Sequence, residues 1–195
     1  MHRITLINGD GIGPEISQSV MSIIKASGLE IDWDIQTAGA DVIEKEGTPL
    51  PKRVLDSVKE NKVALKAPVT TPIGKGFRSV NVQLRKDLDL FANLRPCKNL
   101  PAVKARFENV DLVVVRENTE DLYAGVEEQI DNDTAHSIKI ITRKASERIC
   151  KFAFDYAVKN NRHEVCCVTK ANIMKLSDGL FLESFRNVAQ IFACN

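Results

Sequence analysis

Four polar side chains suited to binding an anion follow a loop rich in glycine and proline at residues 70–78. The proline and glycines of that loop disfavour a helix. A helix is predicted to begin after Ser79, whose side chain can cap the first turn. Asn81 and Arg85 lie four residues apart, so they project from one face of this helix. Free backbone N–H groups, a helix N-terminus and the guanidinium groups of Arg85 and Arg95 indicate a site for a small, highly charged anion.

Three cations end apolar segments that are predicted strands: Arg95, Arg116 and Lys170. In open α/β sheets, ligands bind beyond the carboxyl ends of the strands. One cation at a strand end is usually just exposed to solvent, but three of them together with Arg85 favour a shared site for a polyanion. The guanidinium group of arginine can bind a carboxylate in bidentate fashion. Tyr123 by itself would be a packing aromatic, whereas beside an anion its phenol can donate a proton. Lys170 can act as a base where neighbouring cations favour its neutral form.

The composition is ordinary for a globular protein of 195 residues, with 44% hydrophobic and 27% charged residues. A net charge of +1 offers no broad basic surface for nucleic acid or membrane. The five cysteines form no C-x-x-C pair, which favours a reducing compartment, and the first residues lead into a predicted strand rather than a signal peptide. We therefore expect a cytoplasmic protein without nucleic-acid or membrane partners.

Strand and helix patterns alternate along the chain, which predicts an α/β fold with a largely parallel sheet. The helix that starts at Pro14 should end at Gly28. The predicted strands are residues 3–7, 31–37, 62–67, 90–94, 111–116, 137–142 and 164–169. The further predicted helices are residues 40–46, 52–60, the segment after Ser79, residues 145–159 and residues 173–192.

Four motifs occur in order: G-D-G-I-G-P-E at residues 9–15, the run at residues 70–95, R-E-N-T-E-D-L-Y-A-G at residues 116–125 and V-T-K-A-N-I-M-K at residues 168–175. Together they resemble the β-decarboxylating dehydrogenases of isocitrate and isopropylmalate. S-V-N-V-Q-L-R at residues 79–85 is similar to the isocitrate branch, because the isopropylmalate branch lacks the Ser-x-Asn pair. The first motif does not complete G-x-G-x-x-G, so we interpret its glycines as a tight turn.

The resemblance implies a role for each matching side chain. Five would hold the carboxylates of isocitrate: Ser79, Asn81, Arg85, Arg95 and Arg116. Tyr123 would protonate the enolate carbon left after decarboxylation. Lys170 would reach across a dimer and help to deprotonate the substrate hydroxyl in the partner's site. Thr70 would approach the nicotinamide end of the cofactor, with Asn81 and Asn172 as further candidates.

The implied reaction is hydride transfer to NAD or NADP, followed by loss of CO₂ to form 2-oxoglutarate. A Mg²⁺ or Mn²⁺ ion would polarise the new carbonyl. By resemblance, the metal-binding aspartates and the adenosine-binding loop lie downstream of residue 195, so we expect no metal ligands in this chain. Which nicotinamide cofactor is used is left open.

The implied fold is an isopropylmalate-dehydrogenase-like three-layer αβα sandwich, incomplete at its C-terminal side. We expect residues 1–120 to belong to the large domain and residues 121–195 to a small or clasp domain, which forms a homodimer. Because the implied metal ligands and adenosine-binding loop would lie outside this chain, we expect the 195-residue chain to be an inactive fragment. Two alternatives stay open: a non-catalytic subunit that pairs with a complete chain, and a dehydrogenase of isopropylmalate, homoisocitrate or tartrate.

Overall fold

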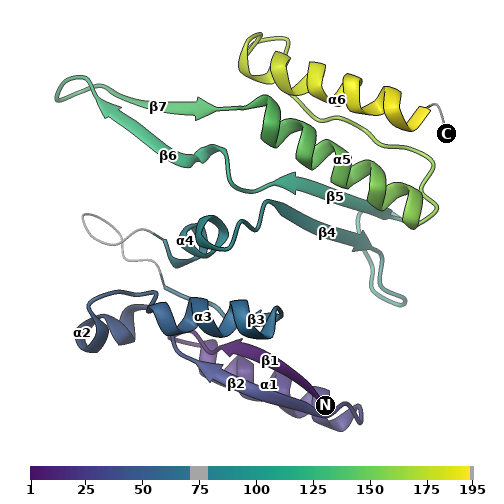
Figure 1. Cartoon of the computed structure of the whole chain (residues 1–195). Coiled ribbons are helices and arrows are strands. Elements are labelled where there is room, and N and C mark those ends of the chain that lie inside the picture. Colours follow the sequence, from purple (N-terminus) through teal and green to yellow (C-terminus); the bar gives the residue numbers. More distant parts are fainter. Residues whose placement is uncertain (71–78, 194–195) are drawn as a thin grey trace. The chain divides into compact units, whose positions relative to one another are not determined.

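The structure is a computed structural model that describes residues 1–70 and 79–193. The chain divides into two units, residues 1–89 and 90–195, and each is described by itself (Figure 1). The predicted boundary at residue 120 falls inside the second unit and stays a prediction. Residues 71–78 of the predicted loop and the cysteine at position 194 lie outside the described residues.

The first unit contains a parallel sheet of three strands, in the order β2-β1-β3. β1 spans His2–Ile7, β2 spans Ile31–Gln36 and β3 spans Ala64–Lys66. Both neighbours of β1 run parallel to it, with Thr5 opposite Asp34 on one side and Ala64 on the other. This is the parallel arrangement that alternating strands and helices predict.

The helices of the first unit are α1 (Gly13–Ala26), α2 (Ile43–Glu46), α3 (Lys52–Asn61) and α4 (Val80–Asp87), with a 3₁₀ turn, η1 (Ala40–Val42). Pro14 occupies the first turn of α1, where its missing N–H leaves no bond unmade. One buried cluster joins β1 to α3 and α4 through Ile7, Val54, Val80 and Leu84. This packing fixes which face α4 turns away from the core.

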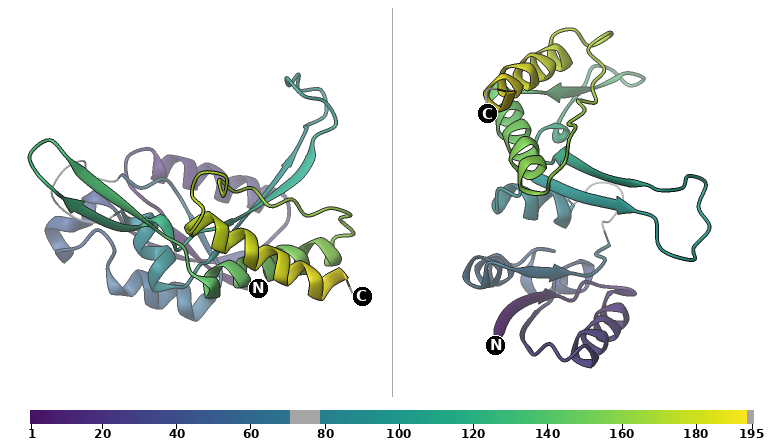
Figure 2. Two further views of the ribbon diagram at one scale, coloured as in Figure 1. Left: turned by 90° about the horizontal axis from the view of Figure 1, so that it is seen from above. Right: turned by 90° about the vertical axis from the view of Figure 1, so that its right-hand side faces the viewer.

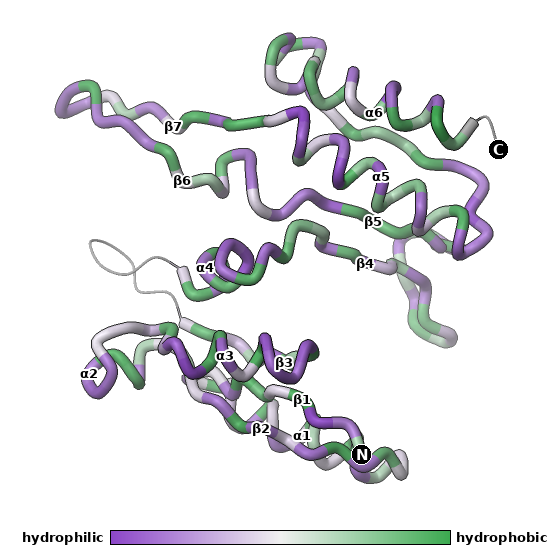
Figure 3. Tube along the Cα trace, in the orientation of Figure 1, coloured by the Kyte–Doolittle hydropathy of each residue, from purple (hydrophilic) through white to green (hydrophobic). Residues whose placement is uncertain are grey.

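The second unit contains two antiparallel hairpins and two long helices. β4 (Ala92–Lys98) pairs with β5 (Asp111–Glu117), and β6 (Asp121–Gln129) pairs with β7 (Ala135–Ile140). α5 spans Arg143–Lys159 and α6 spans Ser177–Ala193. Figure 2 shows the β6–β7 hairpin reaching away from the two helices, and Figure 3 shows the hydrophobic run along β5. Of the described helices, none is long and apolar enough to cross a membrane.

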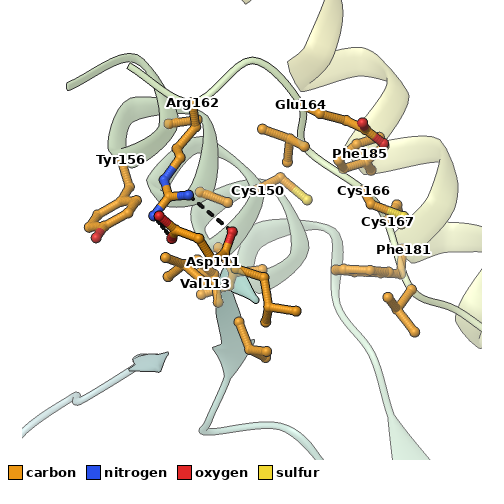
Figure 4. Close-up of a pocket in the computed structure, with 18 residues that line it drawn as sticks. Asp111, Val113, Cys150, Tyr156, Arg162, Glu164, Cys166, Cys167, Phe181 and Phe185 are labelled. Carbon is orange, nitrogen blue, oxygen red and sulfur yellow. Dashed lines mark hydrogen bonds and ion pairs between the residues drawn. The ribbon is translucent and has the colours of Figure 1, made fainter. Parts of the chain in front are cut away.

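The core of the second unit lies where α5 and α6 meet one face of β5. Ile149, Cys150 and Val188 are buried there, and Val115 packs against them. Phe154 stacks on Phe192 with ring centroids 5.2 Å apart. A cavity of about 580 Å³ lies next to this core. It is lined by residues of β5, α5, α6 and the segment after α5 (Figure 4). At its rim, the guanidinium of Arg162 donates to the backbone oxygen of Asp111 at 3.2 Å.

The predicted strand at residues 164–169 is wrong: these residues form no strand in the structure. The apolar run at residues 165–168 is compatible with a buried strand, but a strand also needs a hydrogen-bonded neighbour, and among the described residues β5 pairs only with β4. The prediction of a largely parallel sheet therefore holds for the first unit, whereas both sheets of the second unit are antiparallel.

Two boundaries differ from the predictions by four residues, and one strand was not predicted. Arg95 does not end its strand, because β4 continues through Pro96 to Lys98. Proline is tolerated there since β4 has β5 on one side only. α6 begins at Ser177, after a turn in which Ile173 and Met174 donate to the oxygen of Lys170. The sequence does not predict strand β6, because Gly125 lies in its interior and glycine disfavours a strand interior.

Burial raises the pKa of the Cys150 thiol to about 12, with the nearby Cys167 and Glu147 as smaller causes. Cys97 and Cys166, by contrast, are exposed. Because the thiolate is the reactive form, a shift from 9.0 to about 12 lowers the reactive fraction of Cys150 at pH 8 roughly 1000-fold. We expect a maleimide to modify Cys97 and Cys166 quickly and Cys150 last, with all cysteines alike in denaturant. Peptide mass spectrometry against time tests this order, and early modification of Cys150 would contradict it.

Candidate functional site

Arg95 and Arg116 lie on the same face of the β4–β5 hairpin. Arg116 is directly opposite Asn93, and Arg95 is two residues further along the same strand as Asn93. Side chains on one face recur every second residue, so all three project from one side. Val115, which packs into the core, projects from the other side. The Nε of Arg95 donates to Oδ1 of Asn93 at 3.1 Å, which orients this guanidinium along the face.

Tyr123 lies beside Arg116. The guanidinium carbon of Arg116 is 4.6 Å from the centroid of the Tyr123 ring, in the geometry of a cation–π contact. Tyr123 is 46% exposed, so solvent or a ligand can reach it. A fixed cation next to a phenol can bind a carboxylate and offer a proton to the same molecule. The second unit thus brings together three of the predicted site residues: Arg95, Arg116 and Tyr123.

The acidic residues of the motif at residues 116–125 fix the turn between β5 and β6. The carboxylate of Glu117 accepts from the backbone N–H groups of Thr119 and Glu120, at 2.7 and 2.8 Å. Glu120 accepts from the backbone N–H and hydroxyl of Thr142, the residue that caps α5. These bonds hold the two strand ends that carry Arg116 and Tyr123 in a defined relation.

The first unit carries Ser79, Asn81 and Arg85 on α4. Ser79 is the residue that precedes the helix, as predicted, but its side chain makes no capping hydrogen bond, which corrects the predicted cap. Val80 and Leu84 anchor the helix in the core. Asn81 and Arg85 are both half-buried and lie one turn apart.

Lys66 is a second cation near Arg85 that sequence reasoning missed. The pKa of Lys66 is lowered, first by loss of hydration around its ammonium group and then by the positive charge of Arg85, although Asp10 opposes the shift. Two neighbouring cations repel each other, and an anion bound between them would relieve this repulsion. The signal available in the sequence was a lysine at the end of the third strand, equivalent to the cations predicted at other strand ends.

Asp10 positions Thr70, the residue implied at the nicotinamide end of the cofactor. The buried carboxylate of Asp10 accepts from the backbone N–H and the hydroxyl of Thr70 at 2.7 and 2.8 Å, and from the backbone N–H of Ala40 at 2.8 Å. Burial raises the pKa of Asp10, but the hydrogen bonds from Ala40 and Thr70 outweigh it, so the pKa is lowered overall. The first motif thus contributes a structural carboxylate as well as a turn, in which Gly9 and Gly11 have positive φ.

Lys170 and Asn172 lie in the turn before α6, in the second unit. Both residues are exposed. The backbone N–H of Lys170 donates to Oδ1 of Asp178 at 2.9 Å. Thr70, Ser79, Asn81 and Arg85 belong to the first unit and the remaining site residues to the second, so the meeting of all the cations stays a prediction.

The residues that the structure describes do not by themselves form a metal site. Within the described ranges, no three His, Cys, Asp or Glu side chains gather closely enough to hold an ion. Mg²⁺ and Mn²⁺ prefer several oxygen ligands, which these residues do not supply.

The fold and the motifs define a class. The sequence matches the isocitrate/isopropylmalate dehydrogenase family over residues 3–193, and the chain belongs to this family. It superposes on the crystal structure of isocitrate dehydrogenase from Methylococcus capsulatus with a TM-score of 0.92 and 50% identity, over 99% of this chain and 58% of that one. The predicted isopropylmalate-dehydrogenase-like α/β fold, incomplete in this chain, is confirmed.

The names of the curated relatives include more than one function. The chain is 49% identical to a regulatory chain of the mitochondrial NAD isocitrate dehydrogenase from Dictyostelium discoideum, over 97% of this chain and 52% of the relative. It is 50% identical to catalytic subunit 6 of the mitochondrial enzyme from Arabidopsis thaliana, over 96% and 50%. It is also 48% identical to the chloroplastic 3-isopropylmalate dehydrogenase from Solanum tuberosum, over 96% and 53%. The chain spans about half the length of these relatives.

The predicted cytoplasmic location is wrong by this comparison. The isocitrate dehydrogenases among these relatives are named as mitochondrial, and the isopropylmalate dehydrogenase as chloroplastic. Unpaired cysteines indicate a reducing compartment, but they do not distinguish the cytosol from the interior of an organelle. The cysteine pattern was therefore too coarse for the conclusion drawn from it.

Proposed function

We propose that this chain supplies the substrate-binding half of an NAD(P)-dependent dehydrogenase that oxidises and decarboxylates isocitrate. The observation that carries the proposal is the cation–π pair of Arg116 and Tyr123, with Arg95 on the same sheet face. The guanidinium groups of Arg95 and Arg116 can bind the carboxylates of a tricarboxylic acid. The adjacent phenol of Tyr123 can donate a proton to a carbon of the bound substrate.

The first unit would complete the carboxylate site through Ser79, Asn81 and Arg85, with Lys66 as an added cation. Thr70 would face the nicotinamide, held by Asp10. Asn172 and Asn81 stay as further cofactor contacts, and Lys170 as the base that assists removal of the hydroxyl proton. Bound NAD or NADP would accept the hydride. The names of the Dictyostelium and Arabidopsis isocitrate dehydrogenases specify NAD, so NAD is the first cofactor to test.

The proposed partner is a second subunit, either another copy or a homologous chain. In the proposed arrangement Lys170 serves the partner's site, so a single chain holds parts of two sites. The names of the relatives support assembly, because they distinguish catalytic from regulatory subunits. The metal ligands and the remaining cofactor contacts would come from the half of the family sequence that this chain does not span.

Two other functions are favoured by specific relatives. The 3-isopropylmalate dehydrogenase, at 48% identity, is as similar as the isocitrate enzymes, at 47–50%, and several relatives are named regulatory subunits. Isocitrate has a third carboxylate where isopropylmalate has an alkyl group. Polar side chains near this group would bind the carboxylate of isocitrate but not the alkyl group of isopropylmalate. Ser79 and Asn81 therefore favour isocitrate, and the retained Tyr123 and Lys170 favour a catalytic chain over a regulatory one.

A hybrid protein tests the proposal: residues 1–193 of this chain joined to the corresponding second half of the Methylococcus capsulatus isocitrate dehydrogenase. We expect the 195-residue chain alone to form no NADH with isocitrate and Mg²⁺, and the hybrid to form it. In the hybrid, Ser79→Ala should lower kcat/KM for isocitrate roughly tenfold, the worth of one hydrogen bond to a charged group.

The outcomes separate the alternatives. Preference of the hybrid for 3-isopropylmalate would replace the proposed substrate. A folded hybrid that is inactive with every malate-type acid tested would favour a regulatory chain. NADH formation by the 195-residue chain alone would show that the second half is not needed.

A further inference from the structure

Asp178 is one of two carboxylates that are buried among the described residues, and no function above uses it. It lies in the first turn of α6 and is 6% exposed. A buried carboxylate is unfavourable unless hydrogen bonds and an opposite charge compensate it. The other buried carboxylate, Asp10, positions Thr70, which prompts the question of what Asp178 holds.

The two oxygens of Asp178 have their main partners in different parts of the second unit. Oδ1 accepts from the backbone N–H of Lys170 at 2.9 Å and from the hydroxyl of Thr169 at 3.1 Å. Oδ2 accepts from the ammonium group of Lys139, on β7, at 2.7 Å. Hydrogen bonds from Lys139, Lys170 and Thr169 outweigh the opposing effect of burial and lower the pKa of Asp178, and the same carboxylate raises the pKa of Lys139.

The backbone of Lys170 is fixed although its segment has no regular secondary structure. Its N–H donates to Asp178, and its oxygen accepts from Ile173 and Met174, both at 3.0 Å. The side chain of Lys170, by contrast, belongs to an exposed residue. An anchored backbone with a solvent-exposed side chain suits a lysine that must reach a fixed point on another molecule.

The same carboxylate connects this turn to the hairpin that carries Tyr123. Lys139 also lies 3.7 Å from a carboxylate oxygen of Asp121, the first residue of β6 and two residues before Tyr123. The chain of contacts therefore runs from Lys170 through Asp178 and Lys139 to Asp121.

We propose that Asp178 is a positioning residue that holds the backbone of Lys170 in a set relation to the β6–β7 hairpin. The proposal rests on the function proposed above for Lys170. It assigns Asp178 no contact with substrate, so its effect on the reaction passes through Lys170. A misplacement of a reacting group by about 1 Å can lower a rate about 100-fold.

The first test uses the 195-residue chain itself and needs no activity. In Asp178→Asn, hydrogen exchange of the Lys170 amide should become roughly tenfold faster, because the amide keeps one acceptor oxygen but loses the negative charge that strengthens the bond. Asp111→Asn is the matched control, because Asp111 is an exposed carboxylate that also pairs with a cation, Arg162. Unchanged exchange at Lys170 in Asp178→Asn would overturn the inference.

The second test is a double-mutant cycle in the hybrid protein. We expect Asp178→Asn to lower kcat roughly tenfold with little change in KM for isocitrate, and Asp178→Glu to recover part of the loss. In the Lys170→Ala background, Asp178→Asn should lower kcat no further. Thr169→Val, which removes one contact of Oδ1, provides a milder variant should Asp178→Asn fail to fold.

The outcomes distinguish this inference from the proposed function. If the two single substitutions each lower kcat and their effects multiply in the double variant, Asp178 does not act through Lys170 and only the inference fails. If Lys170→Ala leaves kcat unchanged, the catalytic role proposed for Lys170 fails, and the positioning role fails with it.

Discussion

Replacing Tyr123 by Phe is expected to lower kcat of the hybrid protein for isocitrate about 10²- to 10⁴-fold, the range of a lost general acid. The substitution removes the hydroxyl and keeps the ring. The guanidinium of Arg116, 4.6 Å from that ring, therefore keeps its support. Since Arg116 and Arg95 are the proposed carboxylate ligands, KM for isocitrate should change much less than kcat.

Steady-state kinetics of Tyr123→Phe and Tyr123→Ala separate the two roles of the residue. The alanine variant also loses the cation–π contact, worth about 0.5–1 kcal/mol at an exposed position, and should show a raised KM in addition. Tyr156→Phe is the control, because Tyr156 lies on α5 beside the cavity of the second unit. If Tyr123→Phe kept its kcat, the phenol would not be the proton donor.

The second large effect is expected in the first unit, from Gly9→Ala. Gly9 has a φ of +69°, and a Cβ at this position would lie 2.0 Å from the backbone oxygen of Pro68. Gly11 is a matched control: its φ is +56°, and a Cβ there would meet nothing within 4 Å. Both substitutions carry the strain of left-handed backbone, about 1–2 kcal/mol, but only Gly9→Ala also forces two backbone segments apart.

We expect Gly9→Ala to lower the free energy of unfolding of the first unit by roughly 4 kcal/mol or more, and Gly11→Ala by about 1–2 kcal/mol. The single tryptophan, Trp33, lies on β2, so its fluorescence during urea denaturation reports on this unit. Equal denaturation midpoints for the two variants would contradict the predicted close approach. Because Pro68 lies two residues before Thr70, Gly9→Ala should also weaken the bonds of Asp10 to Thr70.

Local sequence was sufficient for most of the elements. The helices predicted at residues 40–46, 52–60 and 145–159 were found within two residues of their predicted ends, as η1 with α2, as α3 and as α5. Periodicity, proline and capping residues act within one or two turns, so the chain carries this information locally. The strand at residues 164–169 failed because pairing depends on residues that are distant in sequence.

The sequence by itself determined the family, through four motifs in order, and the residues that could bind a polyanion. Only the tertiary structure placed Arg116 against Tyr123 and Arg95 on the same face, and revealed the buried carboxylates Asp10 and Asp178. Motifs specify residue types and spacing. Strand register, burial and contacts between distant residues decide which of those side chains meet, because these depend on how the whole unit packs.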